Sequence, residues 1–152
     1  MKRVILVLMI LMVLPLTSCS HIEDTNGPDD YSVVTITDEK ILSGVYSTMC
    51  VGVFETEIEV SDELTGSYKV SKLSGITEIN TYRSRKDLIT FNIEFTCESG
   101  NAMIVIISND EIIKKIEANQ NVTFEVTNTD HQYKILLVGE SAKASINYEV
   151  VS

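Results

Sequence analysis

Alternation of apolar and polar residues with a period of two is the feature that most constrains the fold of this chain. The clearest case is residues 54–60, Phe-Glu-Thr-Glu-Ile-Glu-Val, where every second residue is a glutamate. This pattern is typical of a β-strand with one buried face and one solvated face. We expect the apolar residues to face the core and the glutamates to face water. The residues concerned are Phe54, Ile58 and Val60 on one face and Glu55, Glu57 and Glu59 on the other.

Further strands are predicted along most of the remaining chain. Segments 88–97, 122–126 and 146–150 repeat the alternation. Segments 103–107 and 135–138 are apolar at every position, which indicates central strands packed on both faces. The other predicted strands are 67–73, 76–82 and 111–118.

Two stretches allow a helix. Isoleucines in 111–118 have helical spacing, but the segment is short and turn residues bracket it at 108–110 and 119–121. A strand is therefore favoured there. In the irregular stretch 40–49 the pattern is weak, and residues 37–40 are suited to start a short helix.

Turn-forming residues recur every eight to twelve positions, which predicts eight or nine short strands in an antiparallel sandwich or barrel. Of the two, we expect a β-sandwich. The predicted turns are 64–66, 74–75, 98–101, 128–130 and 139–140.

The last sixty residues resemble the terminal strands of small jelly-roll or immunoglobulin-like modules on bacterial surface proteins. The resemblance rests on Gly100-Asn101, on the apolar strand 133–139 and on the alternating segment 144–148. A similar ending occurs in β-domains appended to secreted peptidases. The resemblance implies an all-β fold and assigns no functional residue.

Residues 1–19 have the organisation of an export signal. Lys2 and Arg3 precede a thirteen-residue apolar run over 4–16, which is too short to span a bilayer comfortably. It ends in Leu16-Thr17-Ser18-Cys19, which resembles the lipobox of bacterial lipoproteins. That resemblance implies a diacylglyceryl group on Cys19 and cleavage just before it. The alternative is an ordinary secretory signal with an incidental cysteine.

The sequence therefore divides into three parts: a lipoprotein signal peptide (1–18), a lipidated cysteine with a flexible acidic tether (19–32) and a β-sandwich domain (33–152). The predicted location is the cell membrane or the outer membrane, with the domain outside the cytoplasm. Ser20 favours the outer membrane in a two-membrane cell, because inner-membrane lipoproteins usually carry an acidic residue there.

The net charge of −10 argues against nucleic acid as a partner, because phosphate binding needs clustered lysines and arginines. One basic cluster, Arg83, Arg85 and Lys86, is predicted on a hairpin loop after Tyr82. It is a candidate contact for an anionic polymer, a lipid headgroup or an acidic partner. The alternative is a solvated loop tip.

Cys50 and Cys97 remain once Cys19 is assigned to the lipid. Both share the inward parity of their predicted strands. Two remaining cysteines in an exported protein permit one disulfide. Two buried free thiols fit equally well.

No catalytic residue, metal site or cofactor is predicted. His131 next to Asp130 is interpreted as a turn residue, since a hydrolytic triad needs a base held between two partners. His21 lies in the tether. The glutamates of 54–60 are interpreted as a solvated face that protects a sheet edge, and not as paired carboxylates acting on a glycan. Acidic turns at 62–63, 110–111 and 130 offer oxygen ligands for calcium, but no D-x-D-x-D loop is present.

These features predict a membrane-anchored lipoprotein whose sandwich is a non-enzymatic interaction or accessory module for another envelope protein. The alternative is a carbohydrate- or cell-wall-binding module. Sugar binding usually needs exposed aromatic rings, and the chain has no Trp. The tyrosines expected at the surface are Tyr31, Tyr68, Tyr82 and Tyr133.

Overall fold

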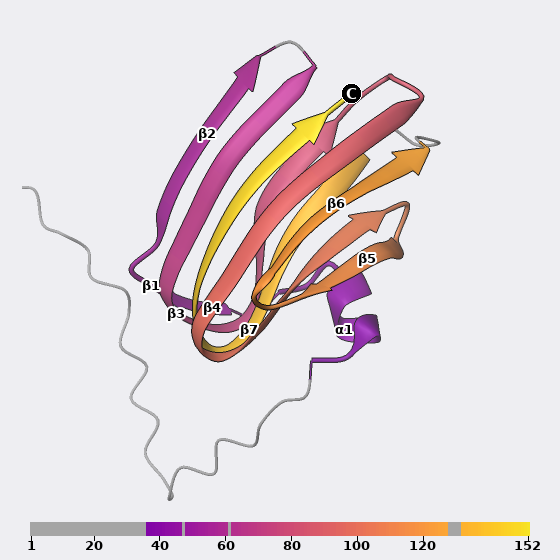
Figure 1. Cartoon of the computed structure of the whole chain (residues 1–152). Helices are drawn as coiled ribbons and strands as arrows, with labels where there is room; N and C mark the ends of the chain where they lie inside the picture. Colours follow the sequence, from indigo (N-terminus) through magenta and orange to yellow (C-terminus); the bar gives the residue numbers. More distant parts are fainter. Residues whose placement is uncertain (1–35, 47, 61, 128–131) are drawn as a thin grey trace, which may run out of the picture. The chain divides into compact units, whose positions relative to one another are not determined.

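The computed structural model describes residues 36–46, 48–60, 62–127 and 132–152. These ranges form one short helix and seven strands of a single antiparallel sheet (Figure 1). In chain order the elements are α1 (Asp38–Leu42), β1 (Thr48–Val51), β2 (Phe54–Val60), β3 (Glu63–Arg83), β4 (Leu88–Ser108), β5 (Glu111–Glu117), β6 (Gln120–Thr127) and β7 (Gln132–Val151). The predictions for the leader, the tether, Cys19, Ser20, His21, Tyr31, Asp130, His131 and the turn at 128–130 lie outside the described residues.

Three strands of 20 or 21 residues organise the fold. β7 lies between β3 and β4 and runs antiparallel to both. Each long strand bends near its middle, where the pairing register shifts at 70–75 and 97–101. Figure 1 shows these strands curving over so that each contributes one half to each of two layers.

The bends explain why several sequence predictions were wrong. The expected turns at 64–66, 74–75, 98–101 and 139–140 all lie inside continuous strands. Gly75 and Gly100 adopt positive φ at two of the bends, so turn-forming residues there bend a strand without ending it. Seven strands therefore replace the eight or nine that were expected, and 67–73 and 76–82 are parts of β3.

The first layer contains β2, the first halves of β3 and β4, the second half of β7, and β6. The second layer contains the other halves of the long strands and β5, with β1 paired to β3 at the bend. The core between the layers is apolar. Phe91 stacks on Phe124 at 5.0 Å between ring centroids and meets the edge of Tyr133 at 5.6 Å. The predicted antiparallel all-β sandwich is confirmed.

The second layer is also covered on its outer face. Ile41 of α1 packs there with Val105 and Leu136 in a separate apolar cluster. Thr37 caps the helix by accepting a hydrogen bond from the Lys40 amide, as its position predicted. This covering explains why 103–107 and 135–138 are apolar on both faces.

The strand prediction for 111–118 is confirmed by β5, which occupies Glu111–Glu117. Among the described residues, no helix has the length and apolar character needed to cross a membrane.

Candidate functional site: an exposed apolar edge on β1 and β2

Strand β2 has the orientation opposite to that expected. Glu57 pairs with Gly66 and Glu59 pairs with Leu64, which is buried in the core, whereas Ile58 pairs with the exposed Thr65. Directly paired residues share a face of the sheet. The three glutamates therefore lie on the face that continues the core side, and the apolar residues lie on the outer face.

Hairpin geometry accounts for this reversal. Only two residues connect Val60 to its partner Glu63, and a loop of that length fixes the register of a hairpin. A strand shifted by one residue would place every side chain on the opposite face. The alternation in the sequence predicted a strand correctly, but it could not show which face would be buried.

The outer face of β2 is consequently an exposed apolar surface. Ile58, Val60 and Phe54 are 67%, 62% and 59% exposed. The surface continues toward β1, where Val51 pairs with the exposed Lys72. We define the apolar edge as Met49, Val51, Val53, Phe54, Ile58 and Val60.

The apolar edge coincides with an edge of the sheet. Within the described chain, β2 pairs with β3 and with no other strand, and Figure 1 shows it at the rim of the first layer. An edge strand presents backbone N–H and C=O groups that a further strand can pair with. Apolar side chains and available backbone groups therefore occur together.

The glutamates on the other face of β2 border a polar arrangement between the layers. The Asn80 amide donates to a Glu57 carboxylate oxygen at 2.7 Å and to the Tyr148 hydroxyl at 3.2 Å. The Tyr148 ring occupies the space over Gly66, where a Cβ atom would overlap it. Burial raises the pKa of Tyr148, the Asn80 hydrogen bond lowers it, and the carboxylates of Glu57 and Glu55 raise it.

Beside the apolar edge, the outer face of the first layer carries a polar hollow of about 420 Å³. Asn92 donates to Glu149 at 2.7 Å and Asn147 donates to Glu94 at 3.3 Å. Ile58 lies at its border. We call this surface the polar hollow after its polar side chains, which belong to Thr56, Thr65, Ser67, Asn92, Glu94, Asn147 and Glu149. Ile58, Gly66 and Tyr148 complete its lining.

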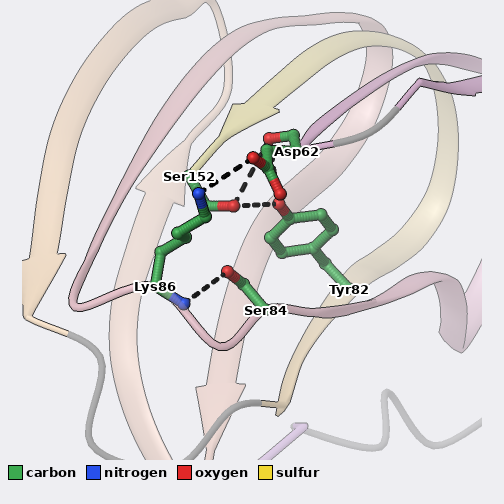
Figure 2. Close-up of polar contacts among 5 residues, drawn as sticks. All are labelled: Asp62, Tyr82, Ser84, Lys86 and Ser152. Carbon is green, nitrogen blue, oxygen red and sulfur yellow. Dashed lines mark hydrogen bonds and ion pairs between the residues drawn. The ribbon is translucent and has the colours of Figure 1, made fainter.

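The basic cluster takes a structural part in the fold (Figure 2). Lys86 forms an ion pair with Asp62 at 3.0 Å, and its amide donates to the buried Ser84 hydroxyl at 3.1 Å. The Tyr82 hydroxyl donates to the Asp62 carbonyl at 3.2 Å and bonds the Ser152 hydroxyl at 2.8 Å. Lys86 thereby links the loop to the β2–β3 connection, and Tyr82, near the end of β3, contacts the residue that follows β7.

The prediction that this cluster lies on a hairpin loop is wrong, because β3 and β4 do not pair with each other. β7 lies between them, and the connection from β3 to β4 passes the end of β7. Arg83 and Arg85 are exposed there, which leaves the contact prediction for them untested.

The structure has Cys50 and Cys97 as free, half-buried thiols. Cys50 pairs with Leu73, which pairs with Ala142, whereas Cys97 pairs with Ala144 on the far side of β7. Three strand spacings, roughly 14 Å, therefore separate them, and a disulfide needs Cα atoms within about 7 Å. The arrangement favours the alternative of two free thiols.

Other candidate residues are not assembled into a site. Tyr68, Tyr82 and Tyr133 are buried, so the expectation of surface tyrosines was wrong for these three, whose rings fill the core. In the described ranges, His, Cys, Asp and Glu form no group of three suited to a metal ion. The polar hollow was missed by sequence reasoning because its residues come from four separate strands.

Comparisons with known proteins add the following. No family model matches the sequence, and no curated protein matches it. A solved structure described as Bacillus endospore appendages that form disulfide-linked pili is similar over 68% of this chain and 90% of its own, at 10% identity and a TM-score of 0.44. A family two carbohydrate esterase from Cellvibrio japonicus is similar over 70% of this chain, at 15% identity and a TM-score of 0.31. The match spans 34% of the esterase chain.

Proposed function

We propose that this protein is a lipid-anchored envelope protein whose β-sandwich binds another protein through the apolar edge. The observation that carries the proposal is the exposure of Phe54, Ile58 and Val60 on the outer face of an edge strand. The membrane anchor is the lipid on Cys19, which the lipobox resemblance supports. The proposal includes no catalytic step, cofactor or metal.

The energetics favour a covered edge. Removing each large apolar side chain from water contributes roughly 1.5–3 kcal/mol, against the cost of association. Contiguous exposed apolar patches beside polar residues are typical of interaction sites on soluble domains. The apolar edge has this character, because the polar hollow borders it at Ile58.

Site-specific cross-linking on intact cells tests the proposal. A photoreactive amino acid at Ile58 should capture one dominant protein, because that side chain would lie within the interface. The matched control is the same group at Glu117, an exposed position on β5, which should capture little. Equal adducts at the two positions, or no protein adduct at Ile58, would contradict a binding role for the apolar edge.

A second candidate function is binding of a cell-wall or extracellular glycan in the polar hollow. Its amides, carboxylates and hydroxyls are groups that hydrogen-bond to sugars, and its volume lies within the usual range of ligand sites, roughly 300–1,000 Å³. Incubation with isolated wall polysaccharide, followed by sedimentation, tests it. Retention that Asn147→Ala and Asn92→Ala abolish would support glycan binding, whereas retention unaffected by both would exclude the polar hollow.

A further inference from the structure

One face of β2 is apolar and the other carries three glutamates. The two faces together define which residues a complementary strand would need. We propose that β2 accepts an extended segment of a partner protein, in which basic and apolar residues alternate, as an additional strand of the first layer. This inference rests on the proposed function and specifies the partner segment. Three observations support it: an edge of β2 that no described strand pairs with, the apolar outer face and the glutamates of the inner face.

The backbone of β2 is suited to pair with a further strand. β2 is seven residues long and pairs along its whole length with β3, so its pleat is regular from Phe54 to Val60. A strand added at the available edge would form a continuous ladder with it. Main-chain hydrogen bonds then supply affinity, while alternate side chains supply specificity.

The side chains of β2 define the residue types expected in the added strand. In an added strand, the residue directly opposite each β2 residue lies on the same face, with Cβ atoms about 4.5–5.5 Å apart. Residues opposite Glu55, Glu57 and Glu59 would therefore meet carboxylates, which favours lysine or arginine. Residues opposite Phe54, Ile58 and Val60 would meet apolar side chains, which favours valine, isoleucine or leucine.

The glutamates of β2 disfavour a second copy of β2 as the occupant. In an antiparallel pair of β2 strands with their apolar faces on the same side, each glutamate with a partner on the other β2 lies opposite another glutamate. In the register centred on Glu57, for example, Glu57 lies opposite Glu57 and Glu55 opposite Glu59. Like charges directly opposite each other destabilise a strand pair. The glutamates therefore act against self-association and select a basic partner.

The Glu57 carboxylate is oriented by a neighbouring residue and can still accept a further hydrogen bond. Its carboxylate accepts the Asn80 hydrogen bond at 2.7 Å through one oxygen, which orients the group while the second oxygen can still accept from a partner cation. Asn80 lies on the second half of β3, beyond the residues that pair with β1. The partner's basic residues would thus approach along the open side of the sandwich between the two layers.

The test uses the full-length lipidated protein in detergent micelles and fluorescein-labelled peptides. The probe is a heptapeptide of alternating lysine and valine, and a peptide of the same composition with lysines and valines in separate blocks controls for net charge. The alternating peptide should bind at least about tenfold more tightly than the block peptide, because only it matches the period of the strand. Equal binding of the two would overturn the proposal.

Charge reversal identifies the site. The triple variant Glu55→Lys/Glu57→Lys/Glu59→Lys should no longer bind the alternating lysine–valine peptide. It should instead bind an alternating glutamate–valine peptide. The matched control, Glu111→Lys/Glu117→Lys/Glu125→Lys, has the same net charge, and its substitutions lie on β5 and β6 at exposed positions. It should bind as the unchanged protein does. An equal loss in both variants would show attraction by net charge alone and would overturn the inference.

The inference and the proposed function can fail separately. Capture of a protein at Ile58 that the triple variant does not reduce would overturn the added strand and leave the interaction role intact. Hydrogen exchange measured with and without the alternating peptide is a second test of strand addition. Protection gained by the amides of β2 supports strand addition, and protection absent from β2 overturns it.

Discussion

At the scale of single residues, the contact between Gly66 and Tyr148 determines how the open side of the sandwich is filled. The two residues are directly paired on β3 and β7, and the Tyr148 ring lies where a side chain of residue 66 would be. The hydroxyl of that ring accepts the Asn80 amide, which also binds Glu57. A glycine in the middle of a strand, normally unfavourable, here makes room for a ring that links both layers to β2.

Gly66→Ala is expected to destabilise the protein by roughly 1–3 kcal/mol, because the added methyl group overpacks the site against the Tyr148 ring. Urea unfolding followed by circular dichroism measures the change. The neighbouring substitution Thr65→Ala, at an exposed position on the outer face, should change the free energy of unfolding by no more than about 0.5 kcal/mol. Similar effects at the two positions would contradict the tight contact.

The raised pKa of Tyr148 predicts a loss of stability at alkaline pH. The ordinary pKa of a tyrosine is about 10, and burial is the main cause that raises the pKa of Tyr148 above it. Above pH 10 the unfolded chain loses this proton while the folded chain keeps it, so the free energy of unfolding falls as pH rises. Below pH 10 the contribution is constant.

Urea midpoints at pH 9, 10 and 11 measure this dependence. In Tyr148→Phe the urea midpoint should fall less above pH 10 than it does in the unchanged protein. Part of the decline should remain, because burial also raises the pKa of Tyr46 and Tyr68. An identical pH profile in both proteins would count against a shifted Tyr148.

At the scale of elements, periodicity predicted strands well and predicted their ends and faces poorly. The alternation in 88–97 correctly placed Phe91, Ile93 and Phe95 in the core, because that segment is flanked by strands on both sides. In 54–60 the same alternation gave the wrong face, because an edge strand takes its register from its hairpin and its one neighbour. Bends such as that at Gly100 were not predictable, since the same residue types also form turns.

The reversed face of β2 gives a direct prediction about stability. Ile58→Ala should cost no more than about 0.5 kcal/mol, because an exposed side chain leaves no cavity. Ile93→Ala on β4, where the residue is 1% exposed, should cost roughly 2–5 kcal/mol. Thermal unfolding of the two variants compares them. A large cost at Ile58 would mean that the outer face of β2 is covered within the monomer.

At the scale of the whole molecule, the sandwich and the proposed lipid anchor are supported by different observations. The sequence alone supports the lipid, through Leu16-Thr17-Ser18-Cys19, whereas the structure supports the β-fold and the apolar edge. The site itself was not predictable from sequence, because β1 and β2 become a surface only through pairing with β3. Both parts are needed to place an interaction surface close to a membrane.

If Cys19 carries the proposed diacylglyceryl group, Cys19→Ala should leave the protein without a lipid, because the acceptor thiol is removed. Two acyl chains give stable anchoring, at about 0.8 kcal/mol for each buried CH₂ group. Detergent-phase partitioning should therefore move the variant into the aqueous phase. If the variant stays in the detergent phase, the anchor lies elsewhere in the chain.

The redox state of the sandwich is also open to measurement. Thiol titration of the denatured, unreduced Cys19→Ala protein should give two thiols for each chain, those of Cys50 and Cys97, because their strands hold them too far apart to bond. A result of zero thiols would require a strand arrangement different from the one described.

The position of β7 has a consequence for when the molecule can fold. It is the last strand along the chain, yet it lies between β3 and β4 in both layers. The two earlier strands have no central partner until residues 132–151 are available, and neither layer can be completed without the other. Neither layer can therefore form before residues 132–151 are available. Under the proposed export, this order of assembly would keep the sandwich unfolded until the whole domain has crossed the membrane.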